Sequence, residues 1–190
     1  KWRRDGNASL VNTSVAAIAS DPNDRTEFAW WTKRAAINAG FTGEIGGRLF
    51  AAIDEFAHNV VEHSEQAASG YVVFAAAPGV FEFVVGDHGV GVVDTLRTNP
   101  RFANLNDAGT ALELALSEGV SRHTEVGRGL GFRPLFVGLA NISHAMRFRT
   151  GDHAREITRN KDRDILSRTL QKSRLPGFVC SVHCRLPPGG

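Results

Sequence analysis

The chain has 190 residues, of which 42% are hydrophobic and 22% are charged, and its formal net charge is +2. These proportions are ordinary for a globular domain and exclude a disordered or fibrous class. The longest central apolar run stops at Pro78, far short of the roughly 20 residues that span a bilayer. We therefore expect one domain over residues 1–190.

The first 41 residues predict a strand followed by a helix. Leu10 to Ile18 is rich in Val, Ile and Thr, which favours a strand. Residues 21–24 indicate a turn that leads into a helix ending near Ala39. Trp30 and Trp31 lie on this helix, and we expect them to pack in the core or on a dimer surface.

The middle of the chain predicts a long helix and then a hairpin. The helix runs from about Thr42 to Ser64, because apolar residues recur there at helical spacing and form a core face. These residues are Leu49, Ile53, Phe56 and Val60. Residues 71–77 and 80–85 predict two strands, and the two residues between them favour a hairpin.

Residues 86–131 are rich in turn-forming and polar residues, and only 107–116 among them indicate a helix. A further helix is predicted from Gly131 to about Leu139. Two strand-like segments, 145–150 and 154–158, are hinged at Gly151-Asp152, a polar basic stretch follows, and the last strand is predicted at 178–186. The expected class is α+β, with one sheet and helices on one face.

Positive charge is concentrated near the C-terminus. Residues 144–174 hold nine Lys or Arg and four Asp or Glu, a net charge of +5. Such a segment could contact nucleic acid, an acidic partner or only solvent. Aromatic residues hardly alternate with the basic ones, which makes nucleic acid the weaker reading.

The two cysteines, Cys180 and Cys184, lie four residues apart in a strand-like segment. That spacing is too long for a disulfide within one strand. His183 would point to the opposite face, so a metal cluster is disfavoured and two buried thiols are expected. Free thiols fit a reducing cytoplasm.

A polar line runs along the helix of residues 42–64. Glu55, Asn59 and His63 recur every four residues and therefore share one face. The amide oxygen of Asn59 suits Mg²⁺, and Glu55 could polarise a nearby water or hydroxyl group. Residues of these types also occur on solvent-exposed helix faces, so this motif alone is weak.

Two glycine-rich motifs follow. Asp87 ends a strand and is followed by Gly89 and Gly91, which could let the backbone approach a nucleotide, although an ordinary turn has the same composition. The second motif stands before a helix, where backbone N–H groups favour an anion such as a triphosphate. Its residues are Gly127, Arg128, Gly129, Leu130 and Gly131.

The order of these three motifs resembles the GHKL superfamily of histidine-kinase-like ATP-binding domains. In that resemblance residues 54–64 are the N box, 87–91 the first glycine box and 127–131 the second, within a core of residues 42–187. The resemblance implies a two-layer α/β sandwich with a mixed, mostly antiparallel sheet. It also implies ATP and Mg²⁺, and a mobile lid over residues 92–126 that becomes ordered when ATP binds.

The resemblance also implies roles for single residues. Asp87 would bind the adenine amino group, Asn59 the Mg²⁺, and Glu55 would act as a base. His63, Gly89, Gly91 and the residues of the second glycine box would complete the nucleotide site. Cys180 aligns where the family often carries a Thr near the adenine.

The short anti-sigma-factor kinases and the sensor-kinase ATPase domains are the most similar types within the superfamily. They imply a cytoplasmic signalling enzyme that transfers the γ-phosphate of ATP to a partner protein, on Ser, Thr or His. Two alternatives stay open: an ATP-hydrolysing conformational clamp, and a non-catalytic module that binds its partner when nucleotide is bound. A homodimer is compatible with each of them.

Overall fold

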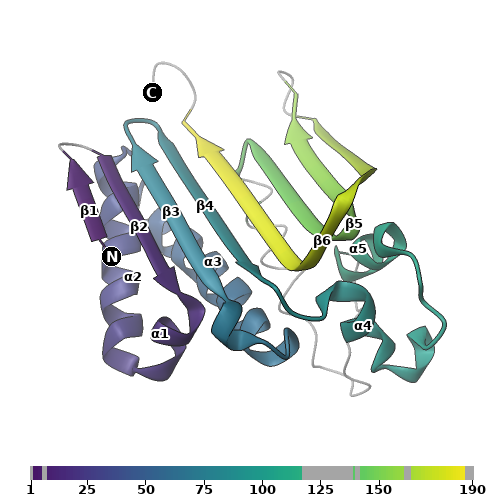
Figure 1. Cartoon of the computed structure of the whole chain (residues 1–190). Helices are drawn as coiled ribbons and strands as arrows, with labels where there is room; N and C mark the ends of the chain where they lie inside the picture. The colour runs from purple at the N-terminus through teal and green to yellow at the C-terminus, as the bar shows by residue number, and fades with distance from the viewer. Residues whose placement is uncertain (1, 6–7, 117–138, 140–141, 161–163, 187–190) are drawn as a thin grey trace.

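A six-stranded sheet with helices packed on one of its faces forms the described part of the chain (Figure 1). The computed structural model describes residues 2–5, 8–116, 139, 142–160 and 164–186. The strands are β1 (Trp2–Asp5), β2 (Ala8–Ser14), β3 (Tyr71–Ala77), β4 (Val80–Asp87), β5 (Ala145–Arg159) and β6 (Ile165–Arg185). The helices are α1 (Val15–Ser20), α2 (Pro22–Asn38), α3 (Gly43–His63), α4 (Gly91–Arg97) and α5 (Ala108–Leu116), with short 3-10 turns η1 (Ala67–Ser69) and η2 (Pro100–Phe102).

The strand order is β1-β2-β3-β4-β6-β5, and each neighbouring pair of described strands is antiparallel. The expected α+β class and two-layer arrangement are therefore confirmed. The resemblance implies a mixed sheet, but the described strands include no parallel pair. The end of β2 explains this difference, because Ser14 pairs with Tyr71 at the start of β3. Helices α1–α3 thus return the chain to the end of the sheet that it left.

Helix α3 and the β3–β4 hairpin form where the sequence predicts them. The Thr42 side chain caps α3 by accepting a hydrogen bond from the N–H of Ile45 at 3.2 Å. The expected core face is buried throughout, at residues Leu49, Ile53, Phe56 and Val60. In the hairpin, Ala77 pairs with Val80 around Gly79, whose φ of 75° suits glycine.

The first predicted strand is too long at its C-terminal end. Strand β2 stops at Ser14, and residues 15–20 form α1. The Ser14 side chain accepts a hydrogen bond from the N–H of Ala17 at 3.2 Å, which begins a helix. Val15 and Ile18, three residues apart, are both buried against the core, so helical spacing replaces the alternation of a strand.

Residues 86–116 are more regular than their composition indicates. Besides α5, which is confirmed, they include α4, where the hydroxyl of Thr95 donates to the carbonyl of Gly91 at 2.8 Å. Leu96 is buried on the inner side of α4. Tertiary packing therefore overrides the turn-forming composition of this stretch.

The two strand segments predicted at 145–150 and 154–158 belong to one strand, β5, which folds back at Gly151. Gly151 has a φ of 54°, and the pairing with β6 shifts register on either side of it. The two ends of β5 lie side by side, since the N–H of Arg159 donates to the carbonyl of His144 at 3.0 Å (Figure 1). The predicted hinge is thus a sharp reversal within β5.

Residues 165–177, most of the polar basic stretch that precedes the last predicted strand, already belong to that strand. Strand β6 begins at Ile165, thirteen residues before the predicted start, and pairs with β5 over both of its halves. Charges occupy cross-strand positions there, because Arg168 lies opposite Glu156 and donates to its carboxylate at 2.9 Å. Without hydrophobic alternation, the sequence does not mark this strand.

Both cysteines are free and buried in the core, as expected. Burial raises the pKa of Cys184 to about 12 and that of Cys180 well above its usual value, so both thiols stay protonated. His183 lies on the other face, where its Nδ1 contacts Glu82. None of the described helices is long and apolar enough to cross a membrane.

Candidate nucleotide site

The loop that follows β4 is packed against the C-terminal end of α3. A Cβ at Gly89 would lie 1.9 Å from the carbonyl oxygen of Ser64, so the loop approaches the helix as only glycine allows. The same carbonyl accepts a hydrogen bond from the N–H of Val90 at 3.0 Å. The hydroxyl of Thr95 donates to the carbonyl of His63 at 3.3 Å. The end of the polar line on α3 and the first glycine-rich motif therefore meet.

Asp87 ends β4 as a buried carboxylate, with 3% of its surface exposed. Its Oδ1 accepts a hydrogen bond from the N–H of Gly89 at 2.7 Å. Burial raises the pKa of Asp87 above the ordinary carboxyl value, and the backbone N–H groups of Gly89 and Phe178 and the charge of His88 only partly oppose this. A buried carboxyl group whose ionisation is disfavoured is more frequent at functional sites than elsewhere.

Two further glycines let the backbones converge around Asp87. A Cβ at Gly177, where φ is 73°, would lie 2.2 Å from the Asp87 carbonyl oxygen and 2.7 Å from its Oδ1. A Cβ at Gly91, where φ is 79°, would lie 2.7 Å from Oγ1 of Thr150. Gly89, Gly91 and Gly177 thus allow close approach of the backbone, and at Gly91 and Gly177 the positive φ angle also favours glycine.

Thr150 joins three elements at this end of the sheet. Its buried hydroxyl accepts a hydrogen bond from the N–H of Val92 at 3.1 Å and donates one to the carbonyl of Gly177 at 2.8 Å. Strand β5, the start of α4 and the bend of β6 are therefore tied together beside Asp87, and Figure 1 shows β4 entering α4 beneath that bend. Sequence reasoning missed both Thr150 and Gly177, although Pro176-Gly177 is a recognisable turn dipeptide.

Cys180 lies on β6 near the end of β4 that carries Asp87. It pairs with Val85, two residues before Asp87, and it is fully buried in the core. Thr150, on the neighbouring strand, is the hydroxyl residue that lies against the glycines around Asp87. The adenine contact that the resemblance assigns to the position of Cys180 stays a prediction, and the structure gives that position a buried thiol.

The polar line on α3 is half-buried. Glu55, Asn59 and His63 each have intermediate exposure, between the core face of the helix and its exposed face. Within the described residues, the Nδ2 atom of Asn59 is buried and makes no hydrogen bond. Leaving a buried amide unsatisfied costs free energy, so Asn59 is better explained by a bound group than by the fold alone.

The side chain of Asn59 suits a magnesium ion that is bound together with a nucleotide. No three His, Cys, Asp or Glu side chains of the described residues gather into a metal-binding group. Mg²⁺ commonly takes one or two protein oxygens and completes its octahedron with water and phosphate oxygens. Asn59 can supply such an oxygen while its Nδ2 donates to a phosphate.

The residues of α3 next to this line are held in place by α2. Both oxygens of Asp54 accept hydrogen bonds from the guanidinium group of Arg25, at 2.8 and 2.5 Å. Bidentate pairs of this kind fix orientation as well as distance. The pair therefore fixes α3 relative to α2 immediately before Glu55.

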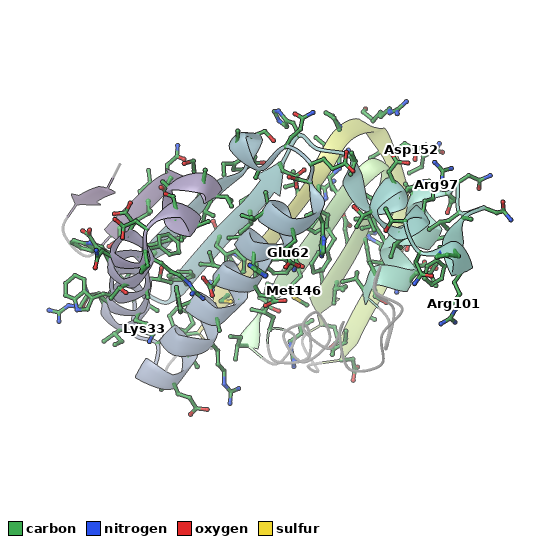
Figure 2. The ribbon with its side chains drawn as sticks, turned by 90° about the horizontal axis from the view of Figure 1, so that it is seen from below. Lys33, Glu62, Arg97, Arg101, Met146 and Asp152 are labelled. Carbon is green, nitrogen blue, oxygen red and sulfur yellow. The ribbon has the colours of Figure 1, made fainter. Side chains whose placement is uncertain are left out.

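The second glycine-rich motif, residues 127–131, lies outside the described residues, as does the end of the expected lid at 117–126. The described part of that lid, residues 92–116, includes most of α4 and all of α5. Figure 2 shows Arg97, of α4, and Asp152, of β5, at the same end of the molecule. Ordering of residues 92–126 by ATP stays a prediction.

No model of a known protein family matches the chain, and no curated protein sequence matches it either. The structure therefore defines the class directly: an α+β domain with a two-layer arrangement of sheet and helices. Its distinguishing site is a buried aspartate at the end of a central strand, surrounded by glycines and adjoining a half-buried polar helix face.

We expect Asn59→Ala to reduce Mg²⁺-dependent nucleotide binding without loss of stability. The substitution removes an amide nitrogen that is buried without a hydrogen bond, so the melting temperature should be unchanged or higher. Calorimetric titration with ATP, with and without Mg²⁺, measures the first effect, and thermal unfolding the second. His58→Ala, on the exposed face of α3, is the control that should change neither. A clear loss of stability in Asn59→Ala alone would make Asn59 a structural residue.

Proposed function

We propose that the chain is an ATP- and Mg²⁺-binding domain that transfers the γ-phosphate of ATP to a partner protein. The observation that carries the proposal is the site around Asp87. A buried carboxylate ends a central strand, its own loop is packed on the end of α3, and α3 presents Asn59 with an unsatisfied amide. The order of these elements along the chain supports a histidine-kinase-like fold.

In the proposed complex Asp87 accepts a hydrogen bond from the exocyclic amino group of adenine. Burial suits this role, because a hydrogen bond to a carboxylate is worth more where water is excluded. The close packing of Gly89, Gly91 and Gly177 brings backbone near the base. His63, at the last turn of α3, lies between this end and the phosphates.

The phosphate end would lie one turn or more toward the start of α3. Asn59 precedes Ser64 by five residues, which is about 7.5 Å along a helix axis. When bound, Mg²⁺ would neutralise charge on the phosphates. Glu55, one turn further, would take the proton from an acceptor hydroxyl of the partner, and residues 127–131 would bind the phosphates.

The acceptor class follows from the chemistry proposed for Glu55. A carboxylate base is suited to a Ser or Thr hydroxyl, whose proton must be removed as the phosphoryl group arrives. We therefore favour a Ser/Thr acceptor on a partner protein. A His acceptor would need no such base, because imidazole is a nucleophile in its neutral form.

We expect Glu55→Gln to bind ATP within about threefold of wild type and to transfer phosphate roughly 10²-fold more slowly, the scale of a lost general base. Glutamine keeps the shape of the side chain but cannot accept the proton. Transfer is measured at saturating ATP and Mg²⁺ as radiolabel on the partner protein and as free phosphate. Glu44→Gln, which removes an exposed carboxylate at the start of the same helix, is the matched control.

The two readouts separate the proposed function from its alternatives. Label on the partner supports transfer, whereas phosphate released without a partner indicates an ATP-hydrolysing clamp. Tight ATP binding with neither product indicates a nucleotide-dependent binder. Near-normal transfer by Glu55→Gln would leave the kinase function standing and would remove Glu55 as its base.

A further inference from the structure

Helix α2 exposes a tryptophan where a helix on the outside of a domain is normally polar. Trp30 has 54% of its surface exposed, and Ile37, two turns further along, has 48%. Helical periodicity places both opposite the buried side chains of α2, which include Phe28, Thr32 and Ala35. The two exposed side chains therefore point directly away from the core. Large apolar side chains in this position are typical of a surface that another molecule covers.

The charges beside Trp30 differ on its two sides. The guanidinium group of Arg34, one turn after Trp30, lies 5.7 Å from the centre of the Trp30 ring. Glu27 lies one turn before, where Oε1 accepts a hydrogen bond from Nε1 of Trp31 at 3.2 Å. An acidic group thus precedes the exposed ring and a basic group follows it.

The other charges of α2 follow a similar division once internal pairs are set aside. Asp24 and Glu27 lie in the first half of the helix, where Arg25 is paired with Asp54 of α3, and Lys33 and Arg34 lie in the second half. Lys33 is directed back toward α3, where its ammonium group lies 5.7 Å from the centre of the Phe50 ring (Figure 2). Arg34 is therefore the cation of the exposed face, and a helix of opposite direction would place a carboxylate against it.

We infer that the outer face of α2 is a contact surface for a second copy of this chain. In a two-fold arrangement with antiparallel α2 helices crossing at Trp30, the two Trp30 rings meet at the axis. Glu27 of each copy then faces Arg34 of the other, because the two residues lie three before and four after the axis. Ile37 lies at either end of the contact. The surface is self-complementary in charge, as an isologous contact requires.

The contact is confined to one helix face, so a weak dimer is expected. Interfaces smaller than the usual range are typical of transient association, and we expect dissociation in the micromolar range. Trp30 would supply most of the affinity, as tryptophan at the centre of an interface commonly does. The inference rests on α2 alone and does not depend on the proposed ATP site.

Analytical ultracentrifugation over a range of protein concentrations tests whether the chain forms this dimer. Wild type should associate reversibly, and Trp30→Ala should raise the dissociation constant at least about tenfold. Leu166→Ala is the matched control, because Leu166 on β6 is equally exposed, at 56%, and lies outside the surface. Circular dichroism verifies that each variant is folded.

Charge reversal distinguishes this arrangement from nonspecific association. Glu27→Arg alone and Arg34→Glu alone should each be monomeric, since each brings like charges together. An equimolar mixture of these two variants should form a dimer, because both contacts are then between opposite charges. A wild type that stays monomeric at 100 times the expected micromolar range, about 100 μM, would overturn the inference. So would a dimer that Trp30→Ala and both charge reversals leave unchanged.

Discussion

A single methyl group added at Gly89 is expected to lower the free energy of unfolding by more than about 3 kcal/mol. The Cβ of an alanine there would lie 1.9 Å from the carbonyl oxygen of Ser64 and 2.7 Å from its carbonyl carbon. Both are backbone atoms at the end of α3, so they cannot turn aside as the tip of a side chain can. The substitution must push the loop off the helix and break the hydrogen bond from Val90 to Ser64.

The control is the same substitution at a glycine inside α3, the helix on which the Gly89 loop packs. A Cβ at Gly47 would meet nothing within 4 Å, and Gly47 is in the interior of the helix. Gly47→Ala should therefore raise the free energy of unfolding by about 0.5–1 kcal/mol, the usual gain from glycine to alanine in a helix. Urea unfolding followed by circular dichroism measures both. A Gly89→Ala variant as stable as wild type would show that the loop is not packed on α3.

Asp87→Asn is expected to weaken ATP binding at least about 10³-fold, the scale for a buried hydrogen-bonding group that loses its complement. The backbone N–H groups of Gly89 and Phe178 are directed at the carboxylate. Asparagine has one acceptor oxygen instead of two. If that oxygen stays with the N–H groups, the amide nitrogen faces the adenine amino group, and two donors oppose each other. Calorimetric titration with ATP measures the loss, and unchanged affinity would remove Asp87 from the site.

The same substitution should not destabilise the protein. Burial raises the pKa of Asp87 in the folded state, so the folded protein holds this proton more tightly than the unfolded chain does. The associated stability is complete below the unfolded carboxyl pKa, about 3.9, and is lost as pH rises through the folded pKa. Asparagine has no such titration. Asp87→Asn should therefore gain stability relative to wild type as pH rises through that window, measured as the difference in melting temperature. If the melting temperature of Asp87→Asn instead falls further below that of wild type as pH rises, the ionised carboxylate stabilises the fold.

Much of the fold could be predicted because its signals are local. The ends of α3 follow from Thr42 and from apolar residues at helical spacing, and each signal acts within a few turns. The β3–β4 hairpin follows from two apolar runs and the Gly79 turn. The part of β6 before residue 178 lacks such a signal, because Arg168 and Glu156 satisfy each other only after the strands pair.

The candidate site also contains residues that the sequence could indicate and residues that it could not. Asp87, Gly89 and Gly91 are adjacent in the sequence, and Asn59 lies on a helix whose period is known, so pattern alone could indicate them. Thr150 and Gly177 are 63 and 90 residues beyond Asp87, and they join this site only because β5 and β6 bend at that end of the sheet. No local pattern encodes that meeting.

The sequence by itself determined where the chain turns, which helix face is apolar and which polar residues share a face, because periodicity and turn chemistry act over short spans. The tertiary structure decided what surrounds each residue. Burial of Asp87 raises its pKa, contact with Ser64 requires glycine at 89, and the outward direction of Trp30 leaves that ring exposed on the surface of the single chain. Each of these depends on which elements pack together, and packing brings together residues that are distant along the chain.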